Sequence, residues 1–129
     1  MGTYIDDVDI NINIIKQFEL TDYITRADKA VVDIAEELGV RDTTDIETNP
    51  VHWKIKEYAK AFLIVDVCLD KMGTNNVETA DTEKYLVLYD VWHKRLKELK
   101  SEITYPMITG DVNEIRDRAS IDSGWLFRG

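Results

Sequence analysis

The 129-residue sequence contains one cysteine, two prolines and six glycines. The single cysteine, Cys68, cannot form an internal disulfide, so we expect a reducing compartment and a small, buried, unreactive side chain. The longest nearly apolar run, Ala61 to Leu69, has about half the length of a membrane span and includes Asp66, so we expect no membrane segment. The acidic N-terminal stretch also lacks the basic segment and apolar core of a signal peptide. These absences favour a small, soluble, intracellular domain.

Basic residues are scarce as well. The chain has 16 lysines and arginines against 25 aspartates and glutamates, a net charge of −9. Because nucleic-acid binding needs an excess of cations to neutralise phosphates, this balance argues against it. Residues 1–93 carry 9 basic and 19 acidic side chains, whereas residues 94–129 carry 7 and 6. An acidic body with a near-neutral tail could order like subunits head to tail, although solubility alone also accounts for the acidity.

The spacing of apolar residues predicts an all-α fold, a small bundle of about four helices. Isoleucines in the first helix would also suit a strand, because they are β-branched. Thr21 is the expected cap of the second helix, and Asn49-Pro50 is expected to open the third. The third helix is apolar around much of its circumference and should therefore be central. The predicted helices span Asp6 to about Phe18, Thr21 to Leu38, Asn49-Pro50 to Met72-Gly73, and Thr79 or Asp81 to Ile103.

After Pro106 the helical periodicity stops, which divides the chain into a helical bundle (1–105) and a C-terminal arm (106–129). We expect the arm to be extended, with a short hairpin or helix in it as the alternative; residues 112–119 could form a short helix, and 104–119 could be a hairpin, a helix or an irregular arm. Its end is aromatic, and aromatic side chains are unfavourable in water. Tryptophan and arginine are typical interface anchors, so we predict that the arm binds a partner; the alternative is that it folds back on its own bundle. The predicted partner-binding residues are Ile121, Trp125, Leu126, Phe127 and Arg128.

No catalytic motif, cofactor site or metal site is expected. Asp90-x-x-His93 is one imperfect match to the paired motifs of a di-iron bundle. Carboxylates do occur on neighbouring helices, as Asp33-x-x-Glu36 and as Asp66 with Asp70. All-α magnesium-dependent nucleotide pyrophosphatases hold their metal with such pairs, but Asp66 and Asp70 are one residue too far apart. Such an enzyme is therefore a minor alternative. The aromatic stripes Trp53, Tyr58, Phe62 and Tyr85, Tyr89, Trp92 are expected to be core.

The layout resembles the head–tail connector proteins of tailed bacteriophages, also called head-completion or adaptor proteins. These are small, acidic helical bundles with an extended C-terminal arm, and the resemblance covers nearly the whole chain through its layout rather than through one diagnostic motif. The matching stretches are Leu20-Thr21-Asp22-Tyr23-Ile24, which opens a helix; Ala27, Ala30, Ile34 and Leu38-Gly39, which close it; the central helix opened by Asn49-Pro50 with its Lys54 to Asp70 run; and the ending Trp125-Leu126-Phe127-Arg128-Gly129.

The resemblance implies a structural protein of the virion neck, assembled in the host cytoplasm. Its copies would form a ring, usually of twelve, beneath the portal protein, with the C-terminal arms gripping the portal. The ring would extend the channel through which genomic DNA passes without specific binding, and it would dock tail or neck proteins. Catalysis, a cofactor and a membrane would play no part. The main alternative is a small helical regulator or binding module, which would more often be a monomer or dimer.

Overall fold

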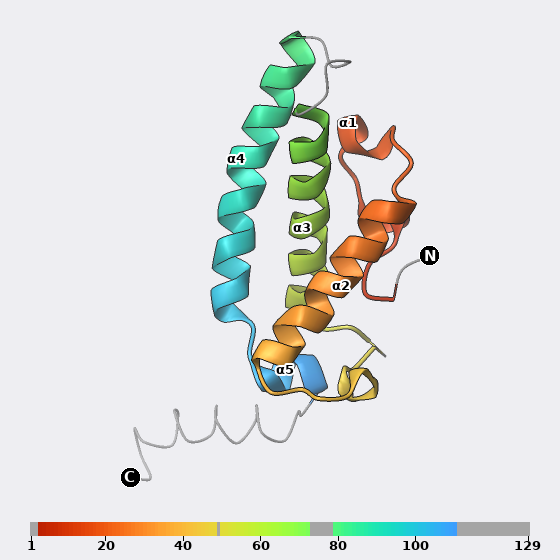
Figure 1. Ribbon diagram of the computed structural model, residues 1–129, viewed down its shortest axis with the longest axis vertical. Helices are drawn as coiled ribbons and strands as arrows, with labels where there is room; N and C mark the ends of the chain where they lie inside the picture. The colour runs from red at the N-terminus through yellow and green to blue at the C-terminus, as the bar shows by residue number, and fades with distance from the viewer. Residues whose placement is uncertain (1–2, 49, 73–78, 111–129) are drawn as a thin grey trace, which may run out of the picture.

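Three long helices, α2 (Thr21–Glu37), α3 (Trp53–Met72) and α4 (Thr79–Glu102), form the body of the protein (Figure 1). The computed structural model describes residues 3–48, 50–72 and 79–110, apart from the side chains of residues 79–82. These residues form helices, turns and loops with no strand, so the predicted all-α class is confirmed. Residues 111–129, which include most of the predicted arm, lie outside the described residues.

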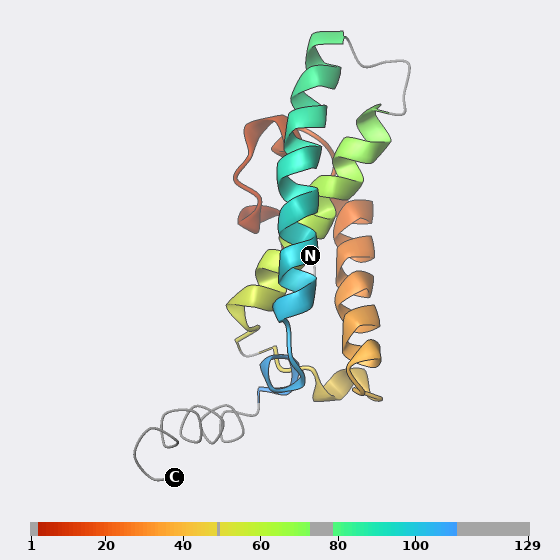
Figure 2. The same ribbon diagram turned by 90° about the vertical axis from the view of Figure 1, so that its left-hand side faces the viewer.

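Helix α3 lies between α2 and α4, as its apolar circumference predicted (Figures 1 and 2). Side chains on several sides of the helix are buried, because α2 covers one side and α4 another. Its length and apolarity do not make it a membrane helix: none of the helices described here is long and apolar enough to cross a bilayer. The buried residues of α3 are Ile55, Tyr58, Ala59, Ala61, Leu63, Ile64, Val65, Val67 and Cys68.

The first predicted helix, Asp6 to Phe18, is wrong as a continuous element. A 3-10 turn, η1 (Asp7–Asp9), and a single short helix, α1 (Asn13–Lys16), replace it. Between them Ile10 and Ile12 have extended backbones, with φ near −93° and −101°. Extended backbone suits β-branched residues, and it allows isoleucines on both sides of the break to be fully buried. The N-terminal segment therefore packs by its isoleucines rather than as an amphipathic helix.

Two helix starts also differ from the prediction. Thr21 is the first helical residue instead of the cap, and the Glu19 carboxylate accepts a hydrogen bond from the Thr21 backbone N–H at 3.1 Å. Helix α3 begins at Trp53 rather than at Pro50. There the His52 Nδ1 accepts a hydrogen bond from the Lys54 N–H at 3.1 Å. In both places a side chain just before the helix satisfies one of the free N–H groups of the first turn.

Helix α2 ends where the glycine predicted. Gly39 adopts a left-handed backbone with φ 100°, and its N–H donates to the Glu36 carbonyl at 3.0 Å. The next N–H, of Val40, donates to the Ala35 carbonyl at 2.9 Å. These two bonds form a Schellman motif, which satisfies carbonyls that the last turn would leave free.

The bundle extends past the predicted boundary at residue 105. A short helix, α5 (Tyr105–Thr109), follows α4, and Pro106 and Ile108 are buried within it. Proline is well suited to the first turn of a helix, because the N–H that it lacks would have no helical partner. The Ile108 carbonyl accepts a hydrogen bond from the Glu47 N–H at 2.8 Å, which ties α5 to the loop after α2. Residues 106–110 therefore belong to the bundle and not to an arm.

Candidate protein-binding face on α4

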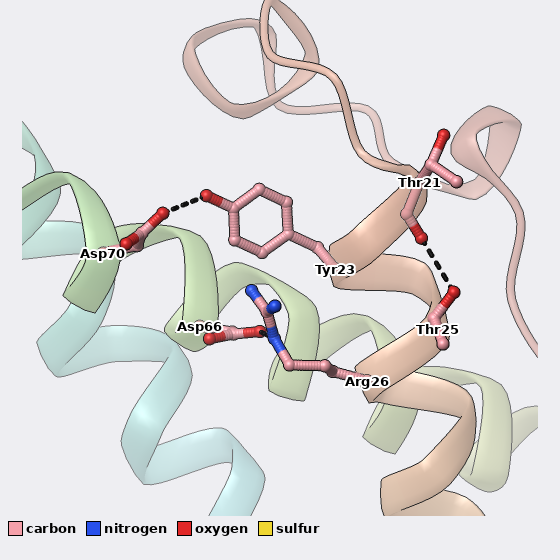
Figure 3. Close-up of polar contacts among 6 residues, drawn as sticks. All are labelled: Thr21, Tyr23, Thr25, Arg26, Asp66 and Asp70. Atoms are coloured by element: carbon pink, nitrogen blue, oxygen red, sulfur yellow. Dashed lines mark hydrogen bonds and ion pairs between the residues drawn. The ribbon is translucent and has the colours of Figure 1, made fainter.

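The carboxylates of α3 that suggested a metal site are engaged by side chains of α2 (Figure 3). Asp66 forms an ion pair with the Arg26 guanidinium at 2.7 Å, and Asp70 accepts a hydrogen bond from the Tyr23 hydroxyl. The Arg26 guanidinium also lies 4.8 Å from the centre of the Tyr23 ring. Burial, followed by the hydrogen bond to Asp70, raises the pKa of Tyr23 to about 12. These four residues form a polar seam that joins α2 to α3.

The other carboxylates of the magnesium hypothesis lie elsewhere. Asp33 and its neighbour Glu37 act electrostatically on Tyr58, whose pKa is raised by burial first and then by these two charges. Tyr58 precedes Asp66 on α3 by eight residues, which corresponds to about 12 Å along a helix. The two acidic pairs therefore do not converge. Across the described ranges, no three histidine, cysteine, aspartate or glutamate side chains are grouped to hold a metal ion.

The histidines and the cysteine have structural roles in the fold. The His93 ring stacks on the Tyr89 ring with 5.0 Å between centres, and Asp90 is exposed. His52 caps α3, and burial followed by the charge of Lys54 lowers its pKa. Cys68 is fully buried, as predicted, and burial raises its pKa to about 11. A thiol in this environment is a poor nucleophile, because the reactive form is the thiolate.

Exposed apolar side chains gather on α4. Leu86, Val87 and Val91 are 49%, 62% and 59% exposed, on consecutive turns of the longest helix. Elsewhere on the described surface the large exposed hydrophobic residues are scattered, and Trp53, predicted to be core, is one of them. Single exposed apolar residues are normal on a protein, whereas adjacent ones on one helix face favour contact with another chain.

Two hollows border these residues. The first is a groove between α4 and the N-terminal segment, with Ile12 and Ile14 on one wall and Val87 and Leu88 on the other. The second follows α4 toward its C-terminal end, where Val91 lies beside polar side chains. A partner that covered the helix would therefore meet apolar side chains flanked by recesses, an arrangement typical of a helix-binding or protein-binding face. We call Leu86, Val87, Val91, Lys94, Arg95 and Glu98 the outer face of α4.

The C-terminal half of this face is basic. Residues 94–100 contain four basic side chains and one acidic side chain, in a protein whose net charge is −9. Lys100 forms an ion pair with Glu37 of α2 at 3.8 Å. Lys94, Arg95 and Lys97 form no ion pair with any described residue. The outer face of α4 thus joins an apolar half to a half with unneutralised positive charge.

Sequence reasoning missed this face. A helical stripe accounts for the side of α4 that packs on α3; its members are Tyr85, Leu88, Tyr89 and Trp92. The apolar residues between its members were not considered, because the stripe alone explained why α4 is amphipathic. Leu86, Val87 and Val91 fall outside the stripe, which is the signal that could have identified them. The predicted partner-binding residues Ile121, Trp125, Leu126, Phe127 and Arg128 lie outside the described residues, so they remain a prediction.

The sequence and the fold were compared with known proteins. Comparisons with protein-family models, with curated proteins and with solved structures each find no match to this chain.

Proposed function

We propose that this chain is a structural adaptor of the phage head–tail connector type, which acts by binding other protein chains and not by catalysis. Its partners in this proposal are a portal protein, tail or neck proteins and further copies of itself in a ring. Genomic DNA would pass through that ring without specific binding. The proposal rests on the sequence layout described above and on one structural observation, the exposed outer face of α4.

Three half-exposed apolar side chains on adjacent turns favour a binding role. Burying Leu86, Val87 and Val91 against a partner contributes on the order of 1 kcal/mol for each side chain. The unpaired cations Lys94 and Arg95 beside them can orient the partner and speed its association. A face of this composition gains free energy when another protein covers it.

The polar seam gives the carboxylates of α3 a structural use. Asp66 and Asp70 hold side chains of α2, and the seam accounts for their presence without a metal ion. The magnesium-dependent hydrolase therefore gains no support from the arrangement of these side chains.

The proposal is tested by measuring mass in solution. Light scattering behind size exclusion, with and without a candidate portal ring, should show about one copy of this chain bound for each portal subunit. A chain that stays a monomer or dimer and ignores portal rings would contradict the connector function and favour a small regulator.

The contribution of the outer face is tested with a polar variant. Val87→Ser with Val91→Ser should weaken binding to the portal or to a neighbouring copy about tenfold or more, because it removes two apolar contacts. Val8→Ser with Leu69→Ser is the matched control, since these residues are also exposed, at 79% and 52%, and lie on other elements. Equal effects of the two pairs would remove the outer face from the proposal.

The predicted anchor is tested by deletion. Removing residues 120–129 should leave the helical content and the unfolding temperature of the bundle unchanged but abolish binding to the portal. A truncated protein that fails to fold would show that these residues complete the core of their own bundle instead.

A further inference from the structure

We propose that the outer face of α4 binds the opposite side of a second copy of this chain, so that copies associate head to tail. The proposal rests on the adaptor function above and deepens it by naming the partner of this face. The surface that it would meet is an acidic hollow beside α2. Charge complementarity between the two surfaces and their positions on opposite sides of the molecule carry the argument.

The outer face supplies the positive side of the contact. Lys94 and Arg95 line a hollow along α4 together with Val91, Trp92 and one acidic residue, Glu98. Neither cation has an ion-pair partner among the described residues. Lys97, one turn further, is also exposed and unpaired there. An acidic protein that leaves these three cations without an ion pair in its described part has a surface to which its own acidic side is complementary.

The negative side is a hollow along α2 that N-terminal residues border. Asp28, Asp33 and Glu36 line it, with Lys29 as the one basic lining residue. N-terminal residues and the 3-10 turn η2 (Thr43–Asp45) with its neighbours border the hollow. It also has an apolar floor, to which Val32 and Ile46 contribute.

The three carboxylates in the hollow differ in what they already bind. Asp28 is held in place, because its carboxylate accepts hydrogen bonds from the backbone N–H groups of Thr3 and Tyr4 at 2.8 and 2.9 Å. Asp33 forms only a long, exposed pair with Lys29, at 3.4 Å. Glu36 forms no ion pair within the described part of the chain. The hollow therefore has negative charge available for cations from outside.

The two surfaces lie on different sides of one molecule. Helix α3 packs between α2 and α4, which the Lys100–Glu37 pair joins near their C-terminal ends, and Figure 1 shows α4 on one side of the bundle with η2 and the N-terminal segment on the other. A contact between different surfaces of identical chains is heterologous, and it produces a closed ring or an open filament rather than a symmetric dimer. The charge pattern thus predicts directional association in which each copy offers its α4 to the next copy's α2.

The experiment uses two charge-reversed variants of the full chain. Lys94→Glu with Arg95→Glu makes the outer face acidic, and Asp33→Lys with Glu36→Lys makes the hollow basic. Sedimentation velocity at low salt should show concentration-dependent self-association of the unmodified chain, weakened by high salt because exposed charges are screened. Each variant alone should self-associate at least about tenfold more weakly than the unmodified chain, because like charges would face each other. An equimolar mixture should recover the association, since every contact in an alternating chain again joins opposite charges.

The control for the reversal of Lys94 and Arg95 is Lys16→Glu with Lys56→Glu, which makes the net charge more negative by the same amount on other elements and should associate like the unmodified chain. Because Lys56 gives up its ion pair with Asp9 at 3.5 Å, the unfolding temperature of this control is compared with that of the unmodified chain. Neutral variants, Lys94→Gln with Arg95→Gln and Asp33→Asn with Glu36→Gln, test the same contact with a smaller effect and less change to the fold. Circular dichroism verifies that each variant keeps its helical content.

Three results would overturn the head-to-tail contact. The unmodified chain could remain monomeric at millimolar concentration in low salt, the reversed variants could associate as it does, or the mixture could fail to recover association. Each leaves the adaptor function to be decided by portal binding, which is measured separately. Conversely, a chain that self-associates through these surfaces but ignores every portal would support the contact and contradict the connector function.

Discussion

Replacing Gly110 with alanine should destabilise the protein more than the same change at Gly39, although both glycines end helices with a left-handed backbone. Their φ angles are 72° and 100°. A Cβ at Gly39 would have no atom within 4 Å, whereas a Cβ at Gly110 would lie 2.9 Å from both Cβ and Cγ of Glu47. The comparison separates the backbone effect, which is common to both sites, from the steric effect, which is present at one.

The magnitudes follow from these two contributions. A residue other than glycine in the left-handed region is less stable by about 1–2 kcal/mol, so Gly39→Ala should lower the free energy of unfolding by about that amount. Crowding at a packed site adds about 1–3 kcal/mol. The Glu47 Cβ cannot rotate away, and the hydrogen bond from its N–H to Ile108 holds the loop in place. Gly110→Ala should therefore lower the free energy of unfolding by about 2–5 kcal/mol.

Urea unfolding followed by circular dichroism measures both free energies. A double-mutant cycle with Glu47→Gly then isolates the crowding, because that change removes the atoms that the new Cβ would meet. In the Glu47→Gly background, alanine at Gly110 should have an effect similar to Gly39→Ala, a coupling of about 1–3 kcal/mol. Equal effects of the two alanine substitutions in the natural background, or no coupling in the cycle, would refute the packing of α5 against the loop.

Three further predictions concern the core and its titrating groups. Ile64→Ala should lower the free energy of unfolding by about 2–5 kcal/mol, because the side chain is fully buried. Leu69→Ala, at an exposed site of the same helix, should change it little. Thermal unfolding of the two variants measures the difference. Cys68, with its pKa raised from 9.0 to about 11, should react with a thiol-specific reagent at pH 8 at least a hundredfold more slowly in the native protein than in urea. The pKa of Tyr23 is raised from 10.0 to about 12, so its protonated hydroxyl stabilises the fold below pH 10, and this contribution is lost as the pH rises from 10 to 12. Urea unfolding across that pH range should therefore show a smaller loss of stability for Tyr23→Phe than for the unmodified protein.

The parts of the fold that the sequence predicted are those decided by local physical chemistry. Helix α2 ends before Gly39 because the left-handed residue is a glycine, and Cys68 is buried because it lies in the helix that is apolar on several sides. The first helix was predicted wrongly because its isoleucines satisfy either a helical or an extended pattern. Only the tertiary contacts of Ile10 and Ile15 decide between them. The burial of Ile108 was not predicted either, because a five-residue helix is too short to give a periodic signal.

The candidate site was less predictable than the fold. Whether Val87 and Val91 are core or surface depends on which sides of α4 the rest of the chain covers, and periodicity reports only the covered side. The charge difference between residues 1–93 and 94–129 was evident in the sequence, but its meaning depends on where α2 and α4 lie. Trp53 shows the opposite error, because an aromatic residue at helical spacing is 59% exposed near the first turn of α3.

The polar seam has a consequence for how α2 aligns with α3. Its Arg26–Asp66 pair is partly exposed, with side-chain exposures of 50% and 24%, so it adds little to the free energy of folding. Its value lies in what it excludes. Sliding α2 by one helical turn, about 5.4 Å, would separate Arg26 from Asp66 and Tyr23 from Asp70 at once. Apolar packing alone tolerates several such alignments on a helix as uniformly apolar as α3. The seam therefore selects one register, and with it the fixed positions of the two faces that lie on either side of the bundle.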